Sequence, residues 1–287
     1  MMRIVITGAG GMTGRELTRQ AALRGIEAIP LSRTDLDITD SSATIRAVKK
    51  AKPDLVINSA GYTAVDEAER MPLVAAEVND AGAANVARAA AETGAAMIQI
   101  SSDYVFDGSS PTPYTPESAT NPLNVYGATK LAGENRVRQT LDHYLIVRTS
   151  WVFSHEGRNF LRTMLRLGRD GAELRIVGDQ RGCPTLAGDL AAALLDAGVS
   201  VAHDKSLSGT YHYCNAGETT WFGFARSIFE ELAVESPVLT EITSDEFGAA
   251  AVRPHYSVLD SSAFSTAFGV APRQWLDALK SIRCLVQ

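Results

Sequence analysis

Tyr126 and Lys130 form a Tyr-x-x-x-Lys pair in a stretch whose pattern predicts a helix. Residues four apart lie on one face of a helix, so the two side chains could act together. The lysine charge would lower the pKa of the phenol electrostatically. The tyrosine could then donate a proton to a carbonyl oxygen as hydride reaches the carbonyl carbon. Chance supplies such a pair in about one sequence in six of this composition, so the interpretation needs support from other residues.

A third polar group lies in the segment 101–106, whose sequence is Ser-Ser-Asp-Tyr-Val-Phe. This segment directly follows a predicted strand, and doubly wound sheets place their ligands at the carboxyl ends of strands. The hydroxyl of Ser102 could therefore reach the same carbonyl oxygen as Tyr126. The alternative is a turn or capping serine, which is the commoner role of Ser-Ser-Asp.

A glycine-rich loop joins the first predicted strand to the first predicted helix. One glycine lets the chain turn sharply, a second lets backbone N–H groups approach a pyrophosphate, and a third lets helix and strand pack closely. The N-terminus of the helix adds partial positive charge. The sequence therefore predicts a dinucleotide site here, rather than a glycine-rich turn without a ligand. The residues that the loop would contribute are Gly8, Gly10, Gly11, Met12 and Gly14.

Arg33 follows the second predicted strand, where an NAD-specific protein often carries an acid that binds the ribose 2′-hydroxyl. A guanidinium at this place could bind the 2′-phosphate of NADP with two hydrogen bonds, so we favour NADPH as the cofactor. The alternative is a solvated loop arginine. Asp37 follows closely and offers an acid on the adenine side, so NADH remains a possible cofactor.

The first 150 residues alternate short β-branched runs with helical patterns, which is typical of βαβ units around a parallel sheet. The predicted strands are Arg3–Thr7, Glu27–Leu31, Asp54–Asn58, Ala96–Ile100 and Tyr144–Arg148. The predicted helices are Glu16–Arg24, Ser41–Ala51, Pro72–Thr93 and Val125–Thr140. This order predicts an α/β fold with a doubly wound parallel sheet of the Rossmann type over residues 1–150.

Residues 151–287 show a mixed pattern and are expected to form a smaller α/β domain for the substrate, partly intercalated with the first. The expected helices are Phe160–Leu167, Asp189–Asp196, Thr220–Leu232 and Gln274–Ile282. The expected strands are Leu174–Val177 and Thr210–Cys214. The segment Glu235–Ser262 shows no assignable element. No internal repeat and no Pro-, Gly- or Ser-rich linker marks a clean boundary.

The composition is that of an ordinary globular protein, with 287 residues, 45% hydrophobic residues and a formal net charge of −6. An acidic chain of this kind is not expected to bind nucleic acid or a membrane surface. Three isolated cysteines and five histidines without metal-ligand spacing suggest neither disulfides nor a metal site. No stretch approaches the about 20 apolar residues of a membrane span, so we expect a cytoplasmic protein.

Longer motifs resemble the dTDP-4-dehydrorhamnose reductase family, within the extended short-chain dehydrogenase/reductases. The glycine loop, Ser102 and the Tyr-x-x-x-Lys pair occur in the order that this superfamily uses. Segments that are similar to the narrower family are Gly61–Glu69 (GYTAVDEAE), Ser102–Gly108 (SDYVFDG), Pro122–Gly127 (PLNVYG), Leu131–Glu134 (LAGE), Arg148–Phe153 (RTSWVF), Asn159–Phe160, Asp179–Thr185 (DQRGCPT) and Arg253–Pro254.

The resemblance implies an enzyme that reduces the 4-keto group of a dTDP-linked 6-deoxyhexose, with dTDP-L-rhamnose as product in the main family. It implies Tyr126 as the acid, Lys130 as its modulator and Ser102 as the third catalytic member, where the family usually has threonine. Further cofactor contacts would come from Ile38, Ala60, Gly61 and Tyr62, beside Tyr126 and Lys130 themselves. Substrate contacts would come from Thr63, Val65, Ser102, Asp103, Tyr104, Trp151, Asn159 and Arg253.

Some relatives join two subunits through Mg²⁺ held by acidic side chains. Glu16 matches one of those positions, but the other acids are not in place, so no metal site is predicted. The chain is expected to be a monomer or a homodimer. Two other functions stay open: a 4-ketoreductase for another dTDP-4-keto-6-deoxysugar of natural-product biosynthesis, and a non-catalytic NADP-binding regulatory subunit, because the family also resembles the regulatory β subunit of methionine adenosyltransferase.

Overall fold

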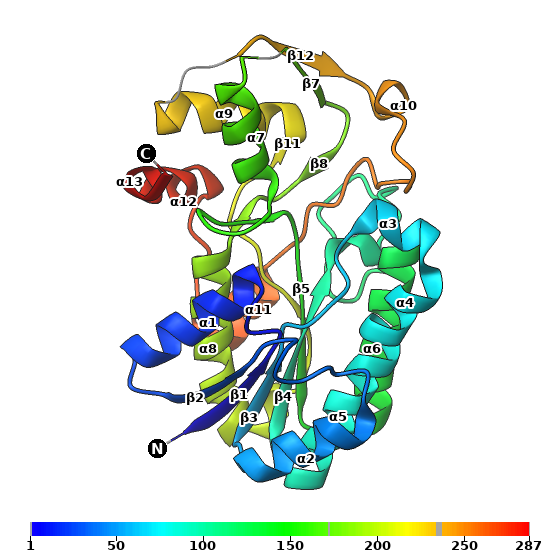
Figure 1. Ribbon diagram of the computed structural model, residues 1–287, viewed down its shortest axis with the longest axis vertical. Helices are drawn as coiled ribbons and strands as arrows, with labels where there is room; N and C mark the ends of the chain where they lie inside the picture. Colours follow the sequence, from blue (N-terminus) through cyan, green and yellow to red (C-terminus); the bar gives the residue numbers. More distant parts are fainter. Residues whose placement is uncertain (1, 172, 234–236, 287) are drawn as a thin grey trace.

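The computed structural model describes residues 2–171, 173–233 and 237–286. A six-stranded sheet, parallel throughout, forms the centre of the larger part of the molecule. Its strands, in spatial order, are β10 (Gly209–His212), β5 (Tyr144–Thr149), β4 (Ala96–Ser102), β3 (Leu55–Asn58), β1 (Arg3–Thr7) and β2 (Glu27–Leu31). Figure 1 shows this body in its lower half, with helices on both faces of the sheet. The predicted doubly wound fold is confirmed.

Alternate residues of the strands supply two separate cores. Ile4 and Ile6 of β1 face one side, where they pack with Leu17. Val5 and Val56 face the other side. Both faces are covered, so the strands are apolar on both sides, as expected for a parallel sheet. The first face is covered by α1 (Met12–Leu23), α8 (Ala187–His203) and α11 (Ser262–Phe268), and the second by α2 (Ser41–Ala51), α5 (Ala83–Thr93) and α6 (Val125–Thr140).

A smaller lobe lies above the carboxyl ends of the sheet strands (Figure 1). Its elements are β6 (Val152–Phe153), α7 (Phe160–Arg169), β7 (Leu174–Val177), β8 (Arg181–Gly182), β9 (Thr185–Leu186), β11 (Thr219–Thr220), α9 (Trp221–Leu232), β12 (Leu239–Ile242), α10 (Ser244–Phe247), α12 (Trp275–Ser281) and α13 (Arg283–Val286). The lobe has its own apolar core, which includes Phe153, Phe224 and Leu279. The chain returns to the body for α8, β10 and α11, so residues beyond 150 contribute to both parts.

Several element predictions need correction. The expected helix Pro72–Thr93 is interrupted: α4 (Pro72–Ala76) leads into a π-helical segment, Glu77–Gly82, before α5 begins. A short helix, α3 (Val65–Arg70), precedes it. Single-turn π segments often occur at functional sites. Here the Asn79 amide binds the backbone of Tyr62 in both directions, at 2.8 and 3.1 Å, and this contact ties the segment to a loop at the carboxyl edge of the sheet.

Other elements differ at their ends. The first helix begins at Met12, four residues before the predicted start. The helix predicted to end at Asp196 runs to His203, because Asp196 points outward to Arg24 while Ala197 and Val201 continue the buried face. The unassigned segment Glu235–Ser262 contains β12 and α10, and residues 234–236 lie outside the described part. The strand predicted to end at Ile100 continues through Ser101 and Ser102, so Ser102 is the last residue of β4.

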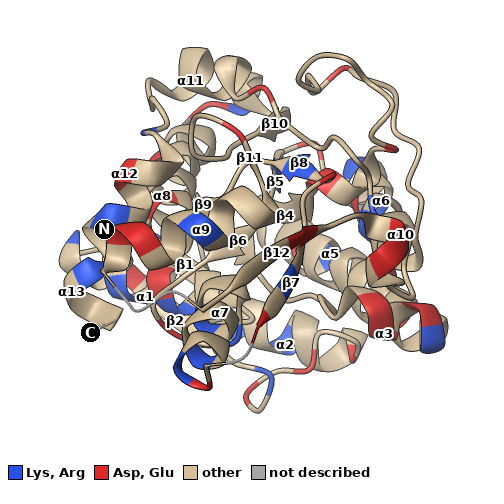
Figure 2. Ribbon diagram, turned by 90° about the horizontal axis from the view of Figure 1, so that it is seen from above, with Lys and Arg blue, Asp and Glu red and all other residues tan. Residues whose placement is uncertain are grey.

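Charged residues lie mainly on the outer helices and loops, as Figure 2 shows from above. Among the described residues, no helix is both long and apolar enough to cross a membrane.

Candidate active site

Two adjoining cavities lie at the carboxyl edge of the sheet, the first within the body and the second between the body and the lobe. The first measures about 430 Å³ and the second about 480 Å³. Both are lined by Gly11, Ser59, Ala60 and Gly61, so they form one continuous cleft. The cleft lies where the sheet order reverses, because β1 has β2 on one side and β3 on the other. This switch point is the usual ligand position of doubly wound sheets.

The glycine loop is shaped for close approach of a ligand. Gly8 has φ +67°, and a Cβ there would lie 2.5 Å from the backbone nitrogen of Ala60. A Cβ on Gly14 would lie 2.4 Å from the Gly8 carbonyl oxygen, so helix α1 packs against the loop only with glycine. No side chain caps the N-terminus of α1, and its first turn contains no acid. Its free N–H groups can therefore bind an anion such as a pyrophosphate.

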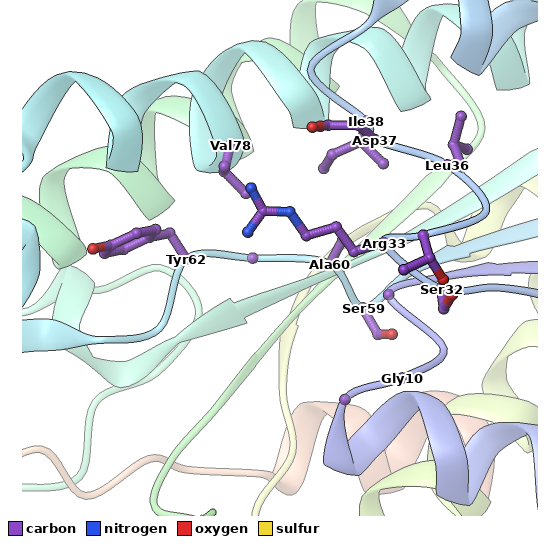
Figure 3. Close-up of a pocket in the computed structure, with 14 residues that line it drawn as sticks. Gly10, Ser32, Arg33, Leu36, Asp37, Ile38, Ser59, Ala60, Tyr62 and Val78 are labelled. Carbon is purple, nitrogen blue, oxygen red and sulfur yellow. Dashed lines mark hydrogen bonds between the residues drawn. The ribbon is translucent and has the colours of Figure 1, made fainter.

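The first cavity contains most of the predicted cofactor residues. Gly8, Gly10 and Gly11 line it together with Arg33, Asp37, Ile38, Ala60, Gly61 and Tyr62. Figure 3 shows the Arg33 side chain extending across the cavity with its guanidinium beside Val78. Asp37 instead accepts hydrogen bonds from the backbone and the hydroxyl of Thr39, at 3.0 and 2.8 Å, and these bonds hold the pKa of Asp37 below its ordinary value.

Helix α6 carries Tyr126 and Lys130 into the second cavity. Asn124 caps this helix, since its side-chain oxygen accepts from the Gly127 N–H at 2.8 Å. A Cβ on Gly127 would lie 2.0 Å from the carbonyl oxygen of Tyr104, which follows β4. Only glycine therefore lets the first turn of α6 pack this closely against the turn after β4. The cap and this contact fix the position of Tyr126 next to the β4 terminus.

Lys130 is buried, and its ammonium donates to the Ile100 carbonyl oxygen at 2.6 Å. Burial lowers the pKa of Lys130 to about 8, although the nearby Glu134 carboxylate raises it. Tyr126 shows the opposite of the expected shift. Burial, together with the charge of Asp103, raises the pKa of Tyr126 to about 12, although a hydrogen bond with Ser102 lowers it. The expectation of a lowered phenol pKa is therefore wrong, because burial and the Asp103 charge raise this pKa, while the Lys130 ammonium binds the Ile100 carbonyl oxygen.

Ser102 is enclosed by polar neighbours. Its hydroxyl donates to one carboxylate oxygen of Asp103 at 3.0 Å and accepts from the Tyr104 N–H at 3.1 Å. Asp103 is itself buried, and its other oxygen accepts from the Ser257 hydroxyl at 2.6 Å. Burial raises the pKa of Asp103 to about 6, although these two hydrogen bonds lower it. Both carboxylate oxygens of this predicted substrate residue are thus bound within the protein.

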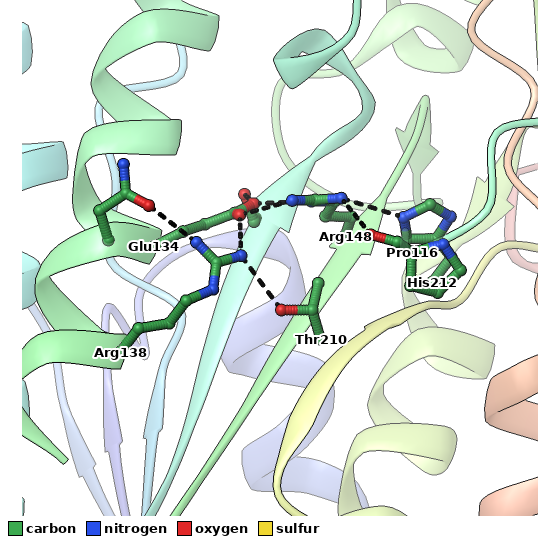
Figure 4. A network of polar contacts seen from close by, with 8 residues as sticks. Pro116, Glu134, Arg138, Arg148, Thr210 and His212 are labelled. Atoms are coloured by element: carbon green, nitrogen blue, oxygen red, sulfur yellow. Dashed lines mark hydrogen bonds and ion pairs between the residues drawn. The ribbon is translucent and has the colours of Figure 1, made fainter. Parts of the chain in front are cut away.

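A buried ion network supports the site from below (Figure 4). Glu134 lies one turn beyond Lys130 and binds Arg148 with both oxygens, at 2.9 and 2.8 Å. It also accepts from Arg138 at 2.8 Å and from the Ser101 hydroxyl at 2.6 Å. Burial alone would raise the pKa of Glu134, but its partners outweigh burial and hold this pKa below its ordinary value. The network therefore fixes an ionised carboxylate beneath Ser101, which adjoins Ser102 in β4.

The predicted sugar contacts line the second cavity together: Thr63, Val65, Ser102, Asp103, Tyr104, Trp151, Asn159 and Arg253. The Tyr104 ring meets the Tyr126 ring edge-on at 5.7 Å. Trp151 has φ +47°, a left-handed conformation that costs a non-glycine residue about 1–3 kcal/mol. Its ring stacks on that of Trp221 with 3.6 Å between centroids, which holds the indole at the cavity wall.

Asn159 and Arg253 have partners within the protein. Asn159 caps α7, and its amide binds the Ser154 carbonyl oxygen at 2.9 Å. Arg253 forms a two-pronged ion pair with Asp66 of α3, at 3.0 and 2.7 Å. Arg253 is therefore already paired with an acid, although Asn159 and Arg253 both still line the cavity.

The model of the family described as the RmlD substrate binding domain matches residues 2–285. The chain belongs to this family. It is 43% identical to a dTDP-4-dehydrorhamnose reductase of Streptomyces griseus over 279 residues, which are 96% of this chain and 91% of that protein. The crystal structure of a dTDP-4-dehydrorhamnose reductase from Clostridium acetobutylicum matches with a TM-score of 0.93 and 40% identity, over 100% of both chains.

A Bacillus anthracis dTDP-4-dehydrorhamnose reductase, solved in complex with NADP, matches with a TM-score of 0.92 and 37% identity over 98% of both chains. The structure of this RmlD-family chain also brings residues to the cleft that sequence reasoning missed. Trp221 and Arg158 line the second cavity, and Ser257 binds Asp103. Trp221 is the second residue of a predicted helix and carried a visible signal as one of three tryptophans, whereas nothing in the local pattern distinguishes Ser257.

Proposed function

We propose that this protein reduces the 4-keto group of dTDP-4-dehydro-L-rhamnose to give dTDP-L-rhamnose, with NADPH as the reductant. The observation that carries the proposal is the continuous cleft, in which a glycine-loop cavity opens directly onto Tyr126 and Lys130. The choice of substrate follows the relatives named dTDP-4-dehydrorhamnose reductase, which match nearly the whole chain.

The first cavity fits a dinucleotide. The close contacts at Gly8 and Gly14 keep side chains out of the loop, and the uncapped N-terminus of α1 offers N–H groups to the pyrophosphate. Gly10, Gly11 and Met12 would border the diphosphate, and Arg33 would bind the 2′-phosphate of NADPH. Ile38, Ala60, Gly61 and Tyr62 would line the adenosine and ribose parts. NADPH, when bound, supplies the hydride that reduces C4 of the sugar.

Tyr126 acts as the general acid. Its raised pKa of about 12 keeps the phenol protonated throughout the neutral range, so the proton is present when the carbonyl oxygen gains charge. A sugar alkoxide is a much stronger base than a phenolate, so transfer from Tyr126 remains favourable despite this raised pKa. Lys130 then lies on the same helix face to stabilise the phenolate, and Ser102 lines the same cavity as the third member of the set.

The sugar would be held on the far side of the cavity. Val65, Tyr104 and Trp151 provide apolar and aromatic surface for the C–H face of a 6-deoxyhexose. Thr63 and Asn159 would hold its hydroxyl groups and the start of the nucleotide, whereas Asp103, predicted as a further contact, is bound by two serine hydroxyls. Arg253 would bind the diphosphate and Asp66 at the same time, because its guanidinium is already paired with the Asp66 carboxylate.

The test is NADPH consumption with a panel of dTDP-4-keto-6-deoxysugars, with NADH as the competing reductant. We expect the highest kcat/KM with dTDP-4-dehydro-L-rhamnose and NADPH. A higher kcat/KM with a 4-keto sugar of another configuration would transfer the assignment to the alternative ketoreductase. Tight NADPH binding without turnover of any member of the panel would support the regulatory interpretation and overturn the proposal.

A further inference from the structure

Asp103 and Ser257 form a buried polar pair behind the proposed acid. Asp103 follows the last residue of β4, whereas Ser257 comes from the segment after α10, 154 residues later. The Ser257 side chain is 1% exposed and that of Asp103 3%. The Ser257 backbone is fixed too, because its N–H donates to the Arg181 carbonyl oxygen at 2.8 Å. A short strand contact between Arg181 and Tyr256 extends this support.

The hydrogen bonds of Ser102 determine which way its hydroxyl points. A serine hydroxyl has one proton and two acceptor lone pairs. In this structure the proton goes to Asp103 and one lone pair accepts the Tyr104 N–H. A single lone pair remains, and it lies in the cavity that Ser102 and Tyr126 line together. The direction of the Ser102 hydroxyl therefore depends on Asp103 accepting its proton.

We propose that Asp103, held by Ser257, is a positioning residue that fixes the direction of the Ser102 hydroxyl in the cavity that also holds Tyr126, in the reaction proposed above. Asp103 acts through Ser102, since both of its oxygens are occupied by serine hydroxyls. The proposal rests on the proposed function for its turnover assay. The contact between Asp103 and Ser257 does not depend on the identity of the sugar.

The charge state of Asp103 makes the proposal testable. The titratable groups that interact with Asp103 are Tyr104 beside it, Tyr126 on α6 and Cys183 between β8 and β9. All three are neutral near pH 7, and Asp103 forms no ion pair with a residue in the described part of the chain. Its pKa of about 6 means that the carboxylate is ionised above that pH and gains a proton below it. Protonation removes one acceptor site and leaves the Ser102 hydroxyl free to rotate, so we expect turnover to fall below about pH 6.

The experiment measures kcat/KM for the keto sugar at saturating NADPH from about pH 5 to 9. The variants are Asp103→Asn, which keeps the shape but cannot titrate, and Ser257→Ala, which removes one hydrogen bond to the carboxylate. Ser208→Ala is the matched control, because the buried Ser208 hydroxyl has no partner among the described residues. Circular dichroism and thermal unfolding would verify that each variant is folded.

We expect an acid limb near pH 6 in the wild type that disappears in Asp103→Asn. In Ser257→Ala the limb should move to higher pH by about one unit, because loss of a hydrogen bond to the ionised form raises the pKa of a carboxyl. Ser208→Ala should keep the wild-type profile. An unchanged acid limb in either Asp103→Asn or Ser257→Ala would overturn the proposal, since a merely structural role would lower stability without moving the limb.

A second readout separates this inference from the proposed function. The infrared C=O stretch of a protonated carboxyl can be followed against pH in the protein without any sugar. A band that titrates near pH 6, is absent in Asp103→Asn and titrates about one unit higher in Ser257→Ala would support the pairing even if the sugar substrate were wrongly assigned. The same band in Asp103→Asn as in the wild type would overturn it.

Discussion

Replacing Tyr126 by phenylalanine removes only the phenol oxygen. The edge-on contact with the Tyr104 ring needs no hydroxyl, so the fold around α6 should remain intact. General acids contribute about 10²–10⁴ in rate, which corresponds to about 3–5 kcal/mol of transition-state stabilisation. We therefore expect kcat to fall by at least about a hundredfold. The dissociation constant for NADPH should change little, because the glycine loop and Arg33 are untouched.

The assay is the initial rate of NADPH oxidation, with NADPH affinity measured separately by calorimetry. Tyr144→Phe is the matched control, since Tyr144 opens β5 and packs against the apolar core, away from the cleft. It should keep wild-type turnover. Retention of more than about a tenth of the wild-type kcat in Tyr126→Phe would refute the acid role. An equal loss in Tyr144→Phe would show that the change acts through stability.

Three further perturbations test other parts of the cleft. Arg33→Ala should weaken NADPH binding more than NADH binding in calorimetry, and equal weakening would make Arg33 a solvated loop arginine. The wild-type kcat/KM should fall above about pH 8 as the Lys130 ammonium loses its proton, because burial depresses this pKa; a flat alkaline profile would contradict that dependence. Glu134→Gln should lower the free energy of unfolding by about 3–5 kcal/mol in denaturant titrations, because Arg148 stays buried without its carboxylate partner. A loss below about 1 kcal/mol would indicate that Arg148 finds another partner.

The body of the fold was predictable because its signals are local. Short runs of Ile, Val and Leu mark β1, β3 and β5, and the capping side chain of Asn124 marks the start of α6. The glycine loop was informative because it falls between a strand and a helix. The π-helical segment was not predictable, since an alanine-rich stretch has the same pattern whether or not the helix is interrupted at Asn79.

The motif residues of the site could be predicted from the sequence, but their burial and their contacts could not. Tyr126, Lys130 and Ser102 do line one cavity, but the pKa of the phenol depends on burial that only the packed structure provides. The stacking of Trp151 on Trp221 joins residues 70 positions apart. The contact of Ser257 with Asp103 spans an even longer separation. Such pairs depend on how the lobe meets the body, which no local pattern encodes.

The most direct test of the account uses NADPH that carries deuterium at the transferable position of the nicotinamide. The enzyme is incubated with dTDP-4-dehydro-L-rhamnose, and the sugar product is identified by NMR. The account predicts dTDP-L-rhamnose with deuterium at C4 and nowhere else. Deuterium at another carbon, a product of different configuration at C4, or no transfer while NADPH remains bound would contradict the assigned reaction.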